Sequence, residues 1–201
     1  MQDPSTLLAA HSLDPQPGES VLDLCAAPGG KLTYIAQLVR NEARLVAYDT
    51  SANRLKLVEE NCKRLGVTCV SFPERDPAGG GTATLSIPPF PAGSYDKILI
   101  DAPCSNTGVL RRRVDLRWRI KAQEIARLRQ VQSDLLNNAA RMLKPGGVLI
   151  YSTCSLEPEE NEDLVAEFLK SNGGFKMASQ RALLPFAENV DGAFVAKLVR
   201  R

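Results

Sequence analysis

Long apolar runs are absent from this chain of 201 residues. No stretch approaches the roughly 20 residues that a membrane-spanning helix needs, and residues 1–4, Met-Gln-Asp-Pro, do not begin a signal peptide. The five cysteines include no Cys-x-x-Cys pair, and their odd number and scattered positions argue against a disulfide scaffold. These absences predict a soluble protein of the reducing cytoplasm.

Histidine and net charge are scarce as well. The single histidine, His11, does not lie in a ligand motif, so a bound metal is not expected. Cys25, Cys104 and Cys154 all follow predicted strands, which leaves a three-thiolate zinc site as an alternative. The formal charge of +2 is too small to identify a partner, and nothing in the sequence specifies an oligomeric state.

Short β-rich runs alternate with longer helical patterns, which predicts a single α/β domain over residues 1–201 with a mostly parallel sheet. The content of hydrophobic residues, 44%, is enough for an ordinary core. Ser51 and Gly66 are typical of the start and end of one helix. The expected strands are residues 20–24, 44–48, 68–72, 95–100 and 147–151, and residues 175–179 and 193–199 should complete the sheet as an antiparallel pair.

Two cysteines stand just past the ends of predicted strands. Residues 101–105, Asp-Ala-Pro-Cys-Ser, follow an Ile-Leu-Ile run, and residues 152–155, Ser-Thr-Cys-Ser, follow Val-Leu-Ile-Tyr. A thiolate is the strongest nucleophile among common side chains, and neighbouring parallel strands bring their ends to one edge of a sheet. The positions of Cys104 and Cys154 therefore indicate covalent catalysis. A predicted helix after Pro158 is expected to lower the pKa of Cys154 through its N-terminus.

The first strand-to-helix turn, residues 25–31, is Cys-Ala-Ala-Pro-Gly-Gly-Lys. Asp49 ends the second strand, where a carboxylate typically accepts hydrogen bonds from ribose hydroxyls. The turn lacks the spacing of a P-loop and of a dinucleotide fingerprint. S-adenosyl-L-methionine fits, because it has ribose and adenine but no pyrophosphate; a tight turn without a ligand is the alternative.

Six segments in chain order are similar to the Sun/NSUN family of RNA cytosine-5 methyltransferases, best known from its bacterial ribosomal-RNA members. They cover nearly the whole chain, and the ordered set is more specific than any one of them. The matching segments are residues 2–5, 23–31, 101–108, 151–155, 158–162 and 191–196. The resemblance implies a Rossmann-like class I S-adenosylmethionine-dependent methyltransferase fold.

The resemblance also implies catalytic roles. Cys154 would attack carbon 6 of a cytosine so that carbon 5 can accept the methyl group, and Cys104 would help release the product. Asp101 would lie between the cofactor and the target base. The cofactor would be held by Cys25, Ala26, Ala27, Pro28, Gly29, Gly30, Lys31, Asp49, Asp76 and Asp101.

A basic stretch follows the Cys104 motif and would border the pocket. Arg111, Arg112, Arg113 and Arg117 are expected to contact RNA phosphates. Trp118 either stacks on a base or, by the interpretation we favour, packs in the core. Two departures from the family stand out: Leu32 replaces a usual Thr, and the N-terminal RNA-binding extension usual in the family is absent.

Rival functions remain open from the sequence. A DNA or small-molecule methyltransferase is one, although the second cysteine and the arginine run favour RNA. A non-catalytic cofactor-binding core that serves as an RNA-binding or assembly module is another. Ribosomal RNA is the expected substrate, and transfer RNA is an alternative within the same chemistry.

Overall fold

The structure, a computed structural model, describes residues 3–73, 91–118 and 120–201. Seven strands in this described part form one sheet in the order β3-β2-β1-β4-β5-β7-β6. Strands β1 to β5 are parallel where they pair, and β7 runs antiparallel to both β5 and β6. The strands are β1 (Ser20–Asp23), β2 (Arg44–Ala47), β3 (Val70–Ser71), β4 (Tyr95–Asp101), β5 (Leu143–Thr153), β6 (Phe175–Leu183) and β7 (Ala193–Arg200).

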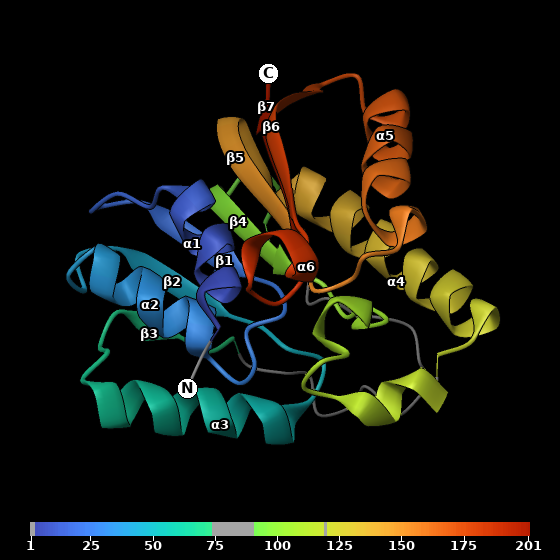
Figure 1. Ribbon diagram of the computed structural model, residues 1–201. Helices are drawn as coiled ribbons and strands as arrows, with labels where there is room; N and C mark the ends of the chain where they lie inside the picture. The colour runs from blue at the N-terminus through green and yellow to red at the C-terminus, as the bar shows by residue number, and fades with distance from the viewer. Residues whose placement is uncertain (1–2, 74–90, 119) are drawn as a thin grey trace.

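Helices cover both faces of the sheet (Figure 1). The first three lie on one face, and α4 and α5 lie on the other. The helices are α1 (Leu8–Leu13), α2 (Gly30–Leu38), α3 (Ala52–Leu65), α4 (Ala122–Met142), α5 (Glu162–Ser171) and α6 (Pro185–Glu188). Short 3-10 turns are η1 (Pro4–Leu7), η2 (Thr107–Val109), η3 (Val114–Trp118) and η4 (Pro158–Glu160). This arrangement confirms the expected α/β fold with a mostly parallel sheet and an antiparallel C-terminal strand.

Alternating side chains of the strands fill two separate cores. In β4, Ile98 and Ile100 belong to the cluster that contains Leu135 of α4, whereas Leu99 belongs to the cluster that contains Ile35 of α2. Successive strand residues point to opposite faces, so one apolar run supplies both layers. Because β1, β4 and β5 are buried on both faces, their ends are held rigidly, and those ends carry the functional residues.

Several expected boundaries are confirmed and others are wrong. The Ser51 hydroxyl accepts a hydrogen bond from the Arg54 amide at the start of α3, and Gly66 ends that helix at φ +67°. The predicted start of β5 at residue 147 is wrong, because the strand already pairs at Leu143 with Tyr95. Gly146, at φ +77°, allows the backbone to bend within the strand.

The N-terminal segment has structure that the sequence did not predict. Residues 4–13 form η1 and α1, and α1 packs on β4, β5 and β7. α1 is only six residues long and no side chain caps its N-terminus, so local signals for it are weak. Its buried residues, Ala9, Ala10 and Leu13, place it on the sheet. No helix in the described ranges is both long and apolar enough to cross a membrane.

Candidate active site

A cleft of about 640 Å³ opens at the carboxyl ends of β1, β2, β4 and β5. In open α/β sheets this edge is where ligands bind, beside the point at which the strand order reverses. The volume lies within the range of small-molecule sites. Residues predicted from the sequence line the cleft together: Cys25, Ala27, Asp49, Asp101, Cys104 and Cys154.

The two motif cysteines lie side by side in this cleft. Their strands are neighbours, with Asp101 of β4 opposite Ser152 of β5, and the Sγ atoms of Cys104 and Cys154 are 3.4 Å apart. The hydrogen bond from Cys104 lowers the pKa of the Cys154 thiol, and the charge of Lys31 lowers it further, against burial and Asp101. The same bond, together with burial, raises the pKa of Cys104 well above its usual value. Cys154 is therefore the readier nucleophile, and Cys104 holds its proton.

The cause of the low pKa of Cys154 differs from the sequence-based expectation. The helix N-terminus is not its source, because η4 intervenes and α5 begins only at Glu162. Helix-dipole effects fall off within about one turn. The pKa of Cys154 is lowered chiefly by Cys104, a residue 50 positions away in the chain.

Asn106 orients the cysteine pair. Its Nδ2 donates to the carbonyl oxygen of Cys104 at 2.7 Å, which directs Oδ1 toward the Cys154 thiol at 2.9 Å. The residue adopts the left-handed conformation, φ +61°, which Asn tolerates better than most side chains. The amide thus links the backbone of one cysteine to the side chain of the other.

Glu160 of η4 lies beneath the pair and is fully buried. Its carboxylate accepts hydrogen bonds from the Ser105 amide at 3.0 Å and from the Ser155 hydroxyl at 2.6 Å. Gln132 of α4 donates to the same carboxylate. Because Ser105 and Ser155 directly follow the two cysteines, one buried carboxylate holds both Cys-Ser motifs in place.

Two side chains hold Asp101, the last residue of β4, in place. Lys31 Nζ lies 2.6 Å from Oδ2, and the Ser152 hydroxyl donates to Oδ1 at 2.9 Å. Burial lowers the pKa of Lys31, but Asp101 outweighs it and the net shift is upward. The carboxylate therefore stays in a fixed orientation between the glycine turn and the cysteines.

The glycine turn has the shape needed to receive a nucleoside. Gly29 adopts φ +103°, and a Cβ there would lie 3.2 Å from Val58 of α3, so a larger residue would strain the turn. Asp49 is 3% exposed, lines the cleft, and accepts a hydrogen bond from the Ser51 amide at 3.0 Å. Cys25 also lines the cleft. A carboxylate at the end of β2 and apolar walls suit a ribose-bearing ligand without a pyrophosphate.

The predicted RNA contacts divide into two groups. All four arginines are exposed, but the guanidinium groups of Arg111 and Arg112 are engaged by buried Asp3 and Asp191, whereas Arg113 lies 3.8 Å from exposed Asp115. The favoured interpretation of Trp118 as a core residue is wrong, since 85% of it is exposed. Its 3-10 turn, η3, buries only Leu116, so the indole faces outward. Asp76 lies outside the described residues.

Asp23, at the end of β1, carries a pH-dependent prediction. Burial, and next the charge of Asp101, raise the pKa of its carboxyl to about 7. Between pH 4 and 7 the folded protein then holds a proton that the unfolded chain has lost, so stability falls as pH rises through this window. We expect Asp23→Asn to remove up to about 4 kcal/mol of this fall. Urea unfolding at pH 4 and pH 8 measures it; an equal pH dependence in both proteins contradicts the assignment.

Sequence reasoning missed several residues of the site. Asn106, Glu160, Asp3 and Asp191 stand in the matching segments, but no role followed from them. Their partners lie far along the chain, as with the Asp191 amide and Asp3, 188 residues apart. The Cys-Ser sequence occurs in both motifs, and this repetition could have indicated that one residue, Glu160, contacts both serines.

Comparison with known proteins agrees with this arrangement. The profile described as 16S rRNA methyltransferase RsmB/F matches residues 10–199. The chain is 41% identical over 213 residues to ribosomal RNA small subunit methyltransferase B of Salmonella paratyphi B, covering 100% of this chain and 47% of that protein. It is 38% identical to the probable ribosomal RNA small subunit methyltransferase B of Bacillus subtilis, covering 88% of this chain and 38% of that protein.

A solved structure shares the fold. The crystal structure of NSun6 from Pyrococcus horikoshii with SFG superposes with a TM-score of 0.83 at 33% identity, covering 99% of this chain and 52% of that one. The chain thus spans about half the length of the relatives it matches, or less. These matches agree with the fold and the cofactor expected from the sequence, those of an S-adenosylmethionine-dependent methyltransferase. Because this profile matches almost the whole chain, residues 10–199, the chain belongs to the 16S rRNA methyltransferase RsmB/F family.

Proposed function

We propose that this chain methylates carbon 5 of a cytosine in RNA, with ribosomal RNA as the substrate class, through a covalent bond to Cys154. The observation that carries the proposal is the pair of thiols 3.4 Å apart at the strand ends, with the pKa of Cys154 lowered and that of Cys104 raised. A methyltransferase acting on an already nucleophilic atom needs no such pair.

The cysteines would act in sequence. Cys154 Sγ forms a bond to carbon 6 of the cytosine, and the electron pair of the 5,6 double bond moves to carbon 5. Bound S-adenosylmethionine supplies the methyl group that carbon 5 takes. The proton on carbon 5 then passes to solvent, its electron pair re-forms the 5,6 double bond, and the Sγ–carbon 6 bond breaks as the sulfur leaves as the Cys154 thiolate. Cys104, adjacent to the leaving sulfur, assists this elimination.

Residues of the glycine turn and the strand ends would hold the cofactor. The assignment covers residues 25–31, Asp49 and Asp101. Cys25, Ala27, Asp49 and Asp101 line the described cleft, and Ala26, Pro28, Gly30 and Lys31 line an adjoining cavity of about 220 Å³. Gly29 is assigned with the rest of its turn, and Asp76 stays a prediction. Lys31 would act mainly through Asp101, because its ammonium group is paired with that carboxylate.

Asp49 gives a direct test of cofactor binding. Asp49→Ala should raise the dissociation constant of S-adenosylmethionine about 5- to 150-fold, since about 1–3 kcal/mol is lost when polar partners are left unsatisfied. Isothermal titration calorimetry measures the change. Asp49→Asn is the matched control, because its side-chain oxygen can still accept the hydrogen bond that the Ser51 amide donates. An unchanged constant in the alanine variant rejects the ribose contact.

RNA would approach through a second cavity, of about 480 Å³, that adjoins the first at Cys104 and Asn106. Arg113 and Lys121 line it together with apolar side chains of Leu116, Ile120 and Leu128. Its one acidic lining residue, Glu124, is paired with Arg127 at 2.7 Å. Cationic side chains can contact the phosphates of the nucleotides that flank an extruded base, and apolar side chains can contact their bases. Of the four arginines predicted to contact RNA phosphates, Arg113 lines this cavity; phosphate contact by Arg111, Arg112 and Arg117 stays a prediction.

Transfer of radiolabelled methyl from S-adenosylmethionine to RNA tests the function. The chain is incubated with total bacterial RNA, and the digested nucleosides are separated. We expect the label in 5-methylcytidine, in ribosomal RNA more than in transfer RNA. Label in transfer RNA alone would change the substrate class. Cofactor binding without any label would favour the non-catalytic module, and label in another nucleoside would reject the covalent mechanism.

A further inference from the structure

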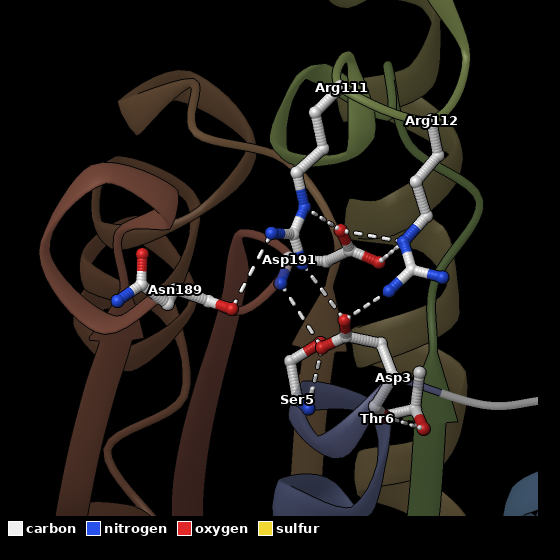
Figure 2. Close-up of polar contacts among 7 residues, drawn as sticks. All are labelled: Asp3, Ser5, Thr6, Arg111, Arg112, Asn189 and Asp191. Atoms are coloured by element: carbon white, nitrogen blue, oxygen red, sulfur yellow. Dashed lines mark hydrogen bonds and ion pairs between the residues drawn. The ribbon is translucent and has the colours of Figure 1, made fainter.

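Four charged side chains from three distant parts of the chain meet beside the cysteine motifs (Figure 2). We name this group, Asp3, Arg111, Arg112 and Asp191, the arginine–aspartate clamp. Arg111 contacts Asp191 through Nε at 2.6 Å and Asp3 through Nη2 at 3.0 Å. Arg112 contacts Asp191 through Nε at 2.8 Å and Asp3 through Nη2 at 2.5 Å. Each arginine therefore bridges both carboxylates.

The two carboxylates are buried, and their other contacts are also satisfied. The side chains of Asp3 and Asp191 are 5% and 7% exposed, while those of the arginines are 42% and 48% exposed. Asp3 Oδ1 accepts hydrogen bonds from the Ser5 and Asp191 amides. Burial raises the pKa of Asp3, but these amides and Arg112 outweigh it and lower the pKa to about 2. The Asp3 carboxylate therefore stays ionised, and it needs the arginines because an unpaired buried charge is costly.

The clamp adjoins the backbone of the catalytic cysteine. The Gly108 amide donates to the Cys154 carbonyl at 2.9 Å, and the Gly192 amide donates to the Gly108 carbonyl at 2.8 Å. A Cβ on Gly108 would lie 2.8 Å from the Cys154 carbonyl oxygen and 2.7 Å from that of Gly192, so the three segments are in tight contact. Arg111 follows Gly108 closely, and Asp191 precedes Gly192. The ion pairs therefore hold together the same backbone segments, around Gly108 and Gly192, that contact the backbone of Cys154.

We infer that Arg111 and Arg112 are positioning residues, which tie the N-terminal segment and the start of β7 to the loop after Cys104 and so hold Cys154 opposite Cys104. This inference rests on the proposed function for its kinetic consequence. It differs from a role in phosphate contact, because Nε and Nη2 of both arginines already bridge the two buried carboxylates. The clamp also makes the site depend on Asp3, at the other end of the chain.

Amide hydrogen exchange tests the clamp without any catalysis. In Arg112→Gln and Asp191→Asn, the Gly108 and Gly192 amides should exchange at least tenfold faster than in the unaltered protein. Arg113→Gln is the matched control, since Arg113 pairs only weakly with exposed Asp115, at 3.8 Å, and should leave both amides unchanged. Unchanged exchange in both clamp variants overturns the inference. If Asp191→Asn does not fold, the exchange rates of Arg112→Gln decide the test, because the Arg112 side chain is half-exposed and its replacement should disturb folding less.

Steady-state kinetics with RNA tests the consequence. We expect kcat of Arg112→Gln to fall at least tenfold with the KM for RNA within twofold, and Arg112→Lys to recover part of kcat. A raised KM with unchanged kcat, and a shallower salt dependence of RNA binding, is the result for a phosphate contact and overturns the inference. If the unaltered chain transfers no methyl group, the proposed function fails, while hydrogen exchange still decides whether the clamp exists.

Discussion

Replacing Cys154 with alanine is expected to abolish methyl transfer to RNA, with a loss of ~10⁴-fold or more, as for other enzymes that lose their nucleophile. Without the sulfur, no bond forms to carbon 6, and carbon 5 of cytosine stays too poor in electrons to accept a methyl group. The dissociation constant of S-adenosylmethionine should not change, because the Cys154 side chain makes its hydrogen bonds to Cys104 and Asn106, neither of which is assigned to the cofactor. Radiolabel transfer and calorimetry on the same preparation measure both quantities.

Cys62 provides the control for this experiment. It is a buried thiol of α3 that does not line the cleft, so Cys62→Ala should keep full transfer even if its stability falls. Persistent labelling of RNA by Cys154→Ala would reject Cys154 as the nucleophile. Lost cofactor binding would instead assign the residue a structural role.

Replacing Cys104 with alanine is expected to trap the enzyme on its substrate. Cys154 can still form its bond to carbon 6, but the elimination that frees the product loses its assisting group. A protein–RNA complex that survives a denaturing gel should therefore accumulate, with little free methylated RNA. The pKa of Cys154 should rise when the hydrogen bond from Cys104 is lost, so the complex should form faster at pH 8.5 than at pH 7.

Two further variants make the trapping result specific. The double variant Cys104→Ala/Cys154→Ala should give no complex, which identifies Cys154 as the attached residue. Cys104→Ser keeps a donor toward Cys154 and should form the complex more readily than Cys104→Ala at pH 7. A covalent complex formed by Cys154→Ala alone would exchange the roles of the two cysteines.

Much of the fold could be predicted from the sequence because its signals are local. Apolar runs of strand length alternate with helical patterns, so the five parallel strands and the antiparallel pair were expected, and β1, β2 and β4 lie close to where they were placed. Ser51 and Gly66 mark the ends of α3 by chemistry that involves only neighbouring residues. The glycine turn, Asp49 and the two cysteines were found because each directly follows a strand.

The tertiary structure decided how those residues act. Only packing of β4 beside β5 brings the two thiols to 3.4 Å and makes their pKa values move in opposite directions. Glu160 supports both Cys-Ser motifs, and Asp3 meets Asp191 and two arginines, through contacts that no local pattern records. The arginine run looked like a surface for phosphates, yet Arg111 and Arg112 are bound to two buried carboxylates of the protein itself. Hydrogen bonds and desolvation act over a few ångströms, so they depend on which distant segments the fold places in contact.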